Sequence, residues 1–470
     1  MIKLLLSSEN PEHYIQKFAF FTENTWKDQQ NDFKVPAAHF SGKKDEVFVD
    51  VSGEKISYLI GLGDEANNFH NIASKFSHSY KSRFSAGTTV LEIAHFNETE
   101  QQNILSGLFL GTYSYPFSST HRFYDNSFKL FVPGLEEETL NKVKQRAQAL
   151  CNGQFACMDW LNKPQNAKRI PEFTSYLKEI ADKYSFRITI YNREECEKLG
   201  LGAFLSVNQG SAQEAAFTIL EYSGGKADSK TVGLVGKCIL FDTGGISIKG
   251  SENLHYMKSD MGGATAVIGA MISAAELNLP LNIVSVLPIT DNAVSNTAYV
   301  PSDVVKAYNG KTIEVLNTDA EGRLTLADGL SYLVRNYKTD AVIDLATLTG
   351  SAVRMFGNTC APYFSNNSDL KNALERSAEK TNQKLWNLPL WHVWEEELHS
   401  DVADFKNISA KPYGDCIVAA KFLEQFIDSH PAWAHLDIAG VAFGNVQYMK
   451  DKGATGYGVQ LLTDFLENFN

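Results

Sequence analysis

Hydrophobic and polar residues follow a strand and helix alternation through the second half of this 470-residue chain. From about residue 230, short apolar runs suited to buried strands alternate with longer segments of helical periodicity. The predicted strands are 232–241, 283–289, 341–345 and 433–438, and the predicted helices are 262–277 and 324–337. This alternation predicts an α/β fold with a mostly parallel central sheet covered by helices.

The first 150 residues predict a smaller α/β domain. Short β-rich runs at 46–51, 55–61 and 89–94 are mixed with an amphipathic, charge-rich segment at 135–150. Asn and Pro residues punctuate the chain between 161 and 173, where we place the domain boundary, because Pro is costly inside regular elements. We therefore expect an N-terminal domain over residues 1–155 and a larger C-terminal domain over residues 165–470. The step Gly61-Leu62-Gly63 lacks the third glycine of a dinucleotide-binding turn, which favours a simple strand end.

Composition and charge narrow the function classes. The chain is 44% hydrophobic and 21% charged, as in ordinary globular proteins, and its formal net charge of -12 disfavours broad nucleic-acid binding. It lacks an apolar run long enough to span a membrane, and its start lacks the apolar core of a secretory signal. The six scattered cysteines form no Cys-x-x-Cys pair. We expect a soluble, cytoplasmic protein without a membrane partner.

Two clusters of charged residues interrupt the apolar pattern of the C-terminal domain. The first cluster, within 237–260, places Lys237, Asp242, Lys249 and Asp260 among glycines and other small residues. The second, at 317–323, reads Asn-Thr-Asp-Ala-Glu-Gly-Arg. Acids that are buried together repel each other unless cations neutralise them. Ligands of α/β sheets collect at the carboxyl ends of strands, where Asp242 and residues 347–350 are predicted to lie. These clusters therefore indicate a metal site.

The charge of the acids indicates two metal ions. Four carboxylates carry about four negative charges, which two divalent cations would balance: Asp242, Asp260, Asp319 and Glu321. Oxygen donors suit zinc, manganese or magnesium without demanding one of them. Lys237 and Asp242 have opposite parity on a strand, so we expect a bend after Phe241 to bring them together. Asp260 has an alternative role as a helix N-cap.

Other interpretations use the same residues. The Gly-Lys step at 236–237 suggests a phosphate loop, but Thr231 stands at the first glycine position and Cys238 replaces the Ser or Thr that holds magnesium. Ser247 and Lys249 form a candidate nucleophile pair of a serine–lysine amidase. Ordinary salt bridges would account for any single pair of charges, but less well for six charged residues in two glycine-rich clusters.

Residues 317–324, Asn-Thr-Asp-Ala-Glu-Gly-Arg-Leu, match the signature of the leucyl aminopeptidases, peptidase family M17, and the chain resembles this family from about Leu161 to its C-terminus. The segments 204–211, 345–350 and 435–440 extend the likeness. The resemblance implies a catalytic C-terminal domain that uses two metal ions to release N-terminal, preferably Leu-like, residues from peptides. It also implies a homohexamer. Some bacterial members bind DNA as well, a role that the acidic balance of this chain disfavours.

The resemblance implies roles for individual residues. The metal ligands would be Lys237, Asp242, Asp260, Asp319 and Glu321, with Lys237 as a neutral amine whose pKa two neighbouring cations depress. Lys249 and Arg323 fall on the two catalytic positions, and Arg323 would hold a bicarbonate that acts as general base. The implied substrate contacts are Met257, Asn317, Thr347, Leu348 and Gly350. Segment 413–420 only loosely follows a family region that is commonly glycine-rich and Thr-containing.

Overall fold

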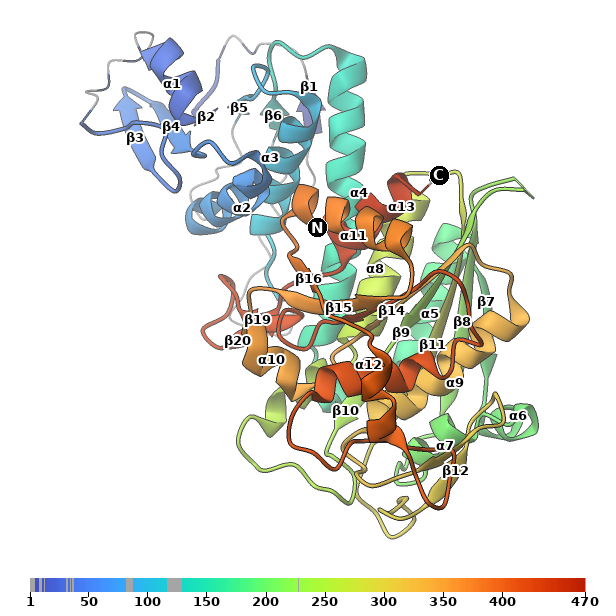
Figure 1. Cartoon of the computed structure of the whole chain (residues 1–470). Coiled ribbons are helices and arrows are strands. Elements are labelled where there is room, and N and C mark those ends of the chain that lie inside the picture. The colour runs from blue at the N-terminus through green and yellow to red at the C-terminus, as the bar shows by residue number, and fades with distance from the viewer. Residues whose placement is uncertain are drawn as a thin grey trace. The chain divides into compact units, whose positions relative to one another are not determined.

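The chain divides into two compact units, Met1–Asn152 and Gly153–Asn470, in a computed structural model (Figure 1). The structure describes residues 5–7, 11, 13–30, 33, 35, 38–81, 88–115, 129–226 and 228–469. The division falls inside one long helix, α4 (Glu137–Asn162), and so precedes the boundary segment expected at 161–173. That segment holds the end of α4, the 3-10 turn η4 (Gln165–Ala167) and the start of α5 (Ile170–Tyr184), where Pro171 occupies the first turn.

The N-terminal unit is an α/β unit around a six-stranded sheet. Its strand order is β1 (Leu5–Ser7), β6 (Lys129–Phe131), β5 (Thr88–Glu92), β2 (Gln16–Phe21), β4 (Lys55–Gly61) and β3 (Val47–Ser52). Only the β3–β4 pair of this order is antiparallel. The helices α1 (Glu23–Gln29), α2 (Phe69–Tyr80) and α3 (Glu98–Gly111) complete its described elements. The three strand runs predicted in this half are confirmed within two residues.

The Gly61-Leu62-Gly63 step ends β4 by close backbone packing. A Cβ atom on Gly61 would lie 2.0 Å from the carbonyl oxygen of Lys43. The Leu62 N–H donates to the Phe21 carbonyl at 2.8 Å. The step is therefore a strand end that only glycine fits, as the missing third glycine predicted.

The C-terminal unit is built on a nine-stranded sheet, whose parallel centre carries antiparallel pairs toward its edges. The order is β16 (Leu385–Asn387), β15 (Ala361–Ser365), β18 (Trp433–Asp437), β14 (Ala341–Ala346), β9 (Thr231–Gly236), β11 (Asn282–Asn292), β8 (Ala216–Ser223) and β7 (Arg187–Tyr191), with β10 (Cys238–Asp242) paired to β11. The pairs β15–β18, β11–β8 and β8–β7 are antiparallel. This arrangement confirms the predicted mostly parallel sheet.

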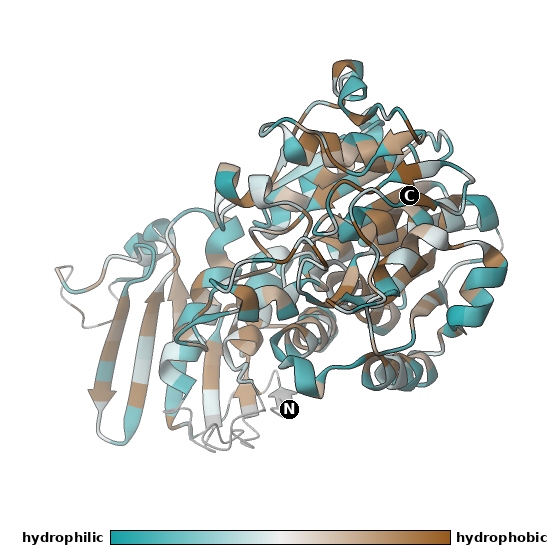
Figure 2. Ribbon diagram, turned by 90° about the horizontal axis from the view of Figure 1, so that it is seen from below, coloured by the Kyte–Doolittle hydropathy of each residue, from teal (hydrophilic) through white to brown (hydrophobic). Residues whose placement is uncertain are grey.

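Helices cover both faces of this sheet. A Cβ on Gly233 would meet Leu333 of α9 (Glu321–Asn336), whereas a Cβ on Gly236 would meet Ala264 of α8 (Gly262–Glu276). Positions 233 and 236 have opposite parity on β9, so the two helices pack on opposite faces. Hydrophobic residues concentrate in the strands and on the inner sides of helices, and hydrophilic residues on the outer sides (Figure 2).

Shorter elements surround the sheet. The remaining helices are α6 (Arg193–Leu199), α7 (Gly202–Asn208), α10 (Gly350–Phe356), α11 (Ser368–Thr381), α12 (Asp415–Glu424) and α13 (Val459–Glu467), and the remaining strands are β12 (Val304–Lys306), β13 (Thr312–Glu314), β17 (Phe405–Lys406), β19 (Phe443–Asn445) and β20 (Lys452–Ala454). Besides η4, the C-terminal unit has the 3-10 turns η5 (Leu254–Ser259), η6 (His392–Trp394) and η7 (Glu396–Leu398), whereas η2 (Ala66–Asn68) belongs to the N-terminal unit. Among the described helices, none combines the length and apolarity needed to cross a membrane.

The single strand predicted at 232–241 is two strands, β9 and β10, which meet at Lys237. Lys237 donates its N–H to the Leu345 carbonyl of β14 at 3.0 Å. β10 keeps the register of β9 on β11 through Ile239, and the register then shifts by one residue before Asp242. The bend therefore lies between Ile239 and Asp242, close to the place after Phe241 where the sequence analysis expected it. The bend lets Lys237 and Asp242 contribute to one site despite their opposite parity.

Candidate metal and catalytic site

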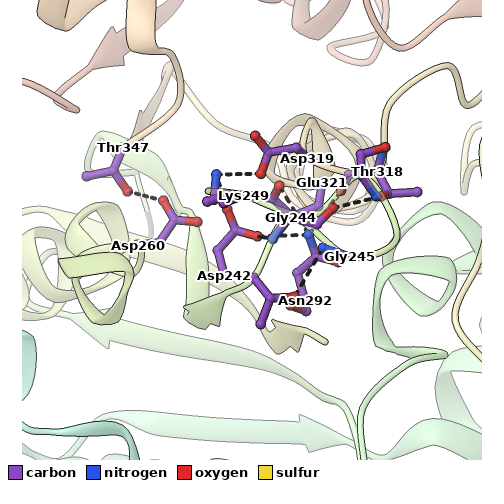
Figure 3. Close-up of polar contacts among 12 residues, drawn as sticks. Asp242, Gly244, Gly245, Lys249, Asp260, Asn292, Thr318, Asp319, Glu321 and Thr347 are labelled. Carbon is purple, nitrogen blue, oxygen red and sulfur yellow. Dashed lines mark hydrogen bonds and ion pairs between the residues drawn. The ribbon is translucent and has the colours of Figure 1, made fainter. Parts of the chain in front are cut away.

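The charged residues of both clusters meet at the carboxyl ends of the parallel strands (Figure 3). Asp242 is the last residue of β10, Asn292 is the last of β11, and Thr347 follows β14. Asp319 and Glu321 arrive from the other cluster, with Glu321 as the first residue of α9. The candidate residues therefore lie at the edge where α/β sheets gather their ligands.

Three acids form a compact group with the geometry of a cation site. One carboxylate oxygen from each of Asp242, Asp319 and Glu321 lies within 4.8 Å of the other two. Asp242 and Glu321 are buried, and Asp319 is half-buried. Buried carboxylates at this spacing need cations beside them.

Two lysines lie among these acids. The Lys237 Nζ lies 2.8 Å from Asp260 Oδ2 and 2.9 Å from Glu321 Oε1, and the Lys249 Nζ lies 2.7 Å from Asp242 Oδ2 and also pairs with Asp319. Four carboxylates against two ammonium groups leave two negative charges without a partner when all six groups are ionised. The site is therefore short of positive charge.

The pKa values of the four acids shift in different directions in this environment. Burial and the neighbouring charge of Glu321 raise the pKa of Asp242 to about 6, and burial also raises the pKa of Asp260 and of Asp319. Burial disfavours the charged form of Glu321 too, but the ammonium groups of Lys237 and Lys249 outweigh burial and lower the pKa of Glu321. Added positive charge would stabilise the ionised form of every acid in the group.

Lys237 is held as an ammonium ion by the charges of the chain itself. Burial alone would lower its pKa, but the carboxylates of Asp260, Glu321 and Asp242 outweigh burial and raise it. The sequence analysis expected the opposite direction, because it placed two cations beside this amine. The difference follows from the neighbours: carboxylates favour the charged amine, and metal ions favour the neutral one.

Sequence reasoning missed Asn292, which supports the acid group. Its Nδ2 donates to Asp242 Oδ1 at 2.8 Å and to the Thr318 carbonyl at 3.0 Å. The Gly244 N–H donates to the same Asp242 oxygen at 2.8 Å. Asn292 stands three residues beyond the predicted strand 283–289, whereas Asp242 directly follows its predicted strand, so the sequence signal for Asn292 was weaker.

Gly322 is required where the signature helix meets Lys237. A Cβ at this position would lie 2.4 Å from Lys237 Cε and 2.6 Å from its Nζ. Any side chain would displace the amine from Asp260 and Glu321. The glycine of the signature therefore keeps room for a lysine from the other cluster.

The geometry does not support two of the alternative interpretations. Ser247 Oγ accepts a hydrogen bond from the Thr318 N–H at 3.1 Å, and the Lys249 Nζ pairs with Asp242 and Asp319, so these contacts do not form a serine–lysine nucleophile pair. Asp260 does not cap α8, because its Oδ1 accepts from Thr347 Oγ1 at 2.8 Å and its Oδ2 faces Lys237. Its carboxylate belongs to the acid group.

The predicted substrate-contact positions lie on several elements, and Thr347 donates to Asp260 of the acid group. Met257 is half-buried in η5, Thr347 and Leu348 are half-buried after β14, and Gly350 opens α10. The Leu348 N–H donates to Asp437 Oδ1 at 3.1 Å and so is already used within the protein. Asn317 accepts the Asp319 N–H at 2.8 Å, which makes it a support for an acid of the group.

Arg323 contacts residues outside the acid group. Its Nη1 donates to the Asn407 carbonyl at 2.7 Å, and its Nη2 pairs with Asp415 Oδ1 at 3.2 Å. Sequence reasoning found neither partner. The signal for Asp415 was its place in segment 413–420, where the chain departs from the family pattern.

A family model described as "Cytosol aminopeptidase family, catalytic domain" matches residues 155–463. This chain belongs to the cytosol aminopeptidase family. It is therefore a hydrolase of the aminopeptidase class. A probable cytosol aminopeptidase of Rickettsia felis is 38% identical over 451 residues, covering 92% of this chain and 90% of the relative. One of Chloroherpeton thalassium is 41% identical over 341 residues, covering 72% of this chain and 67% of the relative.

Solved structures share the fold of this aminopeptidase over almost its full length. A mutant of tomato leucine aminopeptidase superposes with a TM-score of 0.88 at 29% identity, covering 99% of this chain and 96% of that one. The bottromycin maturation enzyme BotP, solved in complex with Mn, superposes with a TM-score of 0.86 at 28% identity, covering 97% and 100%. Both structural neighbours therefore include the N-terminal unit as well as the catalytic one.

Proposed function

We propose that this aminopeptidase uses two divalent metal ions per subunit to release N-terminal apolar, Leu-like residues from peptides. The observation that carries the proposal is the buried group of four acids with only two ammonium groups among them. Two negative charges in excess, next to a half-buried edge of the site, favour binding of cations. The Mn complex of BotP supports this assignment.

The donor set fits metal ions of the zinc, manganese or magnesium kind. The residues that would hold them are Lys237, Asp242, Asp260, Asp319 and Glu321, of which three already have oxygens within 4.8 Å of one another. When bound, such ions supply Lewis acidity and lower the pKa of a coordinated water. Loss of a proton from Lys237 is the step that the protein must contribute, because an ammonium group cannot be a ligand.

Lys249 is the group best placed to act on the substrate. Its side chain is 23% exposed, whereas that of Lys237 is 4% exposed, so Lys249 lies at the open side of the acid group. An ammonium at this place stabilises negative charge that develops on the oxygen of a peptide carbonyl. A free α-amine would be able to coordinate a bound metal ion, which an internal peptide bond cannot do, so the site would prefer a chain end.

Side-chain preference would come from the positions around the acids. Met257 and Thr347 are half-buried, on η5 and after β14, and the Met257 carbonyl accepts the Asp260 N–H at 3.3 Å. Met is an adaptable apolar surface for Leu-like or Met-like side chains. Leu348 and Gly350 would contribute main-chain groups, which for Leu348 means its carbonyl, because its N–H is bound to Asp437.

The residues at Arg323 do not fit the bicarbonate expected from the resemblance. A small oxyanion binds an arginine through two adjacent N–H groups. Asp415 already supplies a carboxylate at Nη2 of Arg323, and its negative charge would repel a second anion at the same guanidinium. We therefore assign no step to a bicarbonate.

Assembly and location complete the proposal. We infer a homohexamer in the cytoplasm, because curated relatives bear the name cytosol aminopeptidase and the family resemblance implies six subunits. The net charge of -12 supports peptides as partners in preference to nucleic acid. Sedimentation of the purified protein tests the assembly directly, and a monomer at micromolar concentration would contradict it.

The decisive experiment measures hydrolysis of leucyl anilides after chelation and after re-addition of zinc, manganese or magnesium. We expect chelation to abolish turnover, re-addition to restore it, and Asp319→Asn or Glu321→Gln to prevent the restoration. Ser247→Ala is the matched control, since a serine–lysine amidase would lose activity in that variant and resist chelators. Full activity in the chelated protein would sink the two-metal proposal.

A further inference from the structure

Arg323 has a resident carboxylate where an anion from solution was expected. Its side chain is buried, with Nη1 bound to the Asn407 carbonyl and Nη2 paired with Asp415. The Nε–H has no hydrogen-bond partner in the part of the chain that the structure describes. A guanidinium remains charged at all relevant pH values, so its burial requires a nearby anion. Asp415 is the acid that the structure places within ion-pair distance.

The Asn407 side of the guanidinium is fixed by the framework of the site. Asn407 Nδ2 donates to the Asn317 carbonyl at 2.7 Å, and its Oδ1 accepts the Leu316 N–H at 2.8 Å. These bonds tie Asn407 to the segment that leads into Asp319. The hydrogen bond from Nη1 is thereby fixed in direction, and Nη2 points to Asp415.

Asp415 is placed by the turn that opens α12. Gly414 adopts a left-handed conformation with φ 72°, and a Cβ there would lie 2.6 Å from the Trp394 ring. This close approach orients the start of the helix, and an acid in its first turn is favoured by the helix dipole. The Asp415 side chain is 39% exposed, so it bridges a buried guanidinium and solvent.

We propose that Asp415 is the built-in anion of Arg323, so that this aminopeptidase turns over without dissolved bicarbonate. Asp415 is a positioning residue: it holds the guanidinium and occupies the place of a small oxyanion. The proposal gives segment 413–420 a function, since its departure from the glycine-rich family pattern introduces this acid. It rests on the proposed aminopeptidase function for its kinetic test.

The kinetic test compares wild-type protein, Asp415→Gly and Asp415→Asn in carbon dioxide-depleted buffer with Mn. Added bicarbonate should change the wild-type rate less than about twofold. The hydrolysis rate of Asp415→Gly should be lower by about tenfold or more. Millimolar bicarbonate or formate should restore most of this rate, because the space left by the side chain admits an anion. Asp415→Asn should lose activity without rescue, since its amide fills the same space without charge.

A second measurement does not depend on activity. Bicarbonate should raise the melting temperature of chelator-treated Asp415→Gly and leave that of the wild type unchanged. A wild-type rate that rises severalfold with bicarbonate, or an Asp415→Gly protein that neither loses activity nor responds to anions, would overturn the proposal. If no metal-loaded protein hydrolyses leucyl anilides, the proposed function fails, and the melting experiment still decides the role of Asp415.

Discussion

The two units share an architecture but differ in the charge at the ends of their strands. In the N-terminal unit, Glu92 ends β5, and Lys17 neutralises it at 2.5 Å. In the C-terminal unit, Asp242 and Asn292 end strands beside a group of acids that two lysines do not neutralise. A parallel sheet supplies an edge where strand ends meet, and uncompensated buried charge makes that edge a site.

The largest expected effect is the difference between two acids that end strands. Asp242→Asn should lower kcat/KM by about a thousandfold, because it removes a donor from the acid group, whereas Glu92→Gln should stay within about twofold. Leucyl anilide hydrolysis with Mn measures both. The melting temperature of metal-free Asp242→Asn should not fall, because the change relieves repulsion. Equal losses in the two variants would remove the contrast between the units.

The dependence of stability on pH should have opposite signs in the two units. Burial lowers the pKa of His70 to about 4 in the N-terminal unit, and burial raises the pKa of Asp328 to about 7 in the C-terminal unit. As the pH falls, the unfolded chain binds a proton at His70 before the folded chain does. The free energy of unfolding of the N-terminal unit should therefore fall by about 3 kcal/mol between about pH 6.5 and 4. The ionised form of Asp328 is disfavoured in the folded chain but not in the unfolded chain. The free energy of unfolding of the C-terminal unit should therefore fall by about 4 kcal/mol as the pH rises from about 4 to 7.

Hydrogen exchange of peptides from α2 and α9 resolves these two trends within one sample. After correction for intrinsic exchange, protection of α2 should fall toward pH 4, and protection of α9 should fall toward pH 7. His70→Gln and Asp328→Asn should each flatten the trend of their own unit only. Parallel trends in both peptides would contradict the assignment.

The smallest expected effects concern helix caps, in which the units should behave alike. Asn97 accepts the Glu100 N–H at 3.0 Å at the start of α3, and Asn367 accepts the Leu370 N–H at 2.9 Å at the start of α11. Asn97→Ala and Asn367→Ala should each cost about 1 kcal/mol of stability and leave kcat/KM unchanged. Urea denaturation measures the cost. A loss of activity in either variant would mean that caps and site are coupled.

Local pattern was sufficient to locate most elements near the site. The 262–277 helix and the 283–289, 341–345 and 433–438 strands lie within three residues of α8, β11, β14 and β18. Their apolar periodicity and length are local properties, so a single sequence records them. The interruption of the predicted strand at Lys237 escaped, because strand ends depend on pairing with other strands, which a local apolar pattern does not record.

The sequence by itself determined the fold class, the family and the acids of the candidate metal site, because strand spacing and an eight-residue signature are written along the chain. Only the tertiary structure decided which charges meet: Lys237 with Glu321, Lys249 with Asp319, and Arg323 with Asp415. Ion pairing depends on distance and burial after folding, and both clusters contribute to each of the first two pairs. The same dependence separates the compensated Glu92 from the uncompensated acids around Asp242.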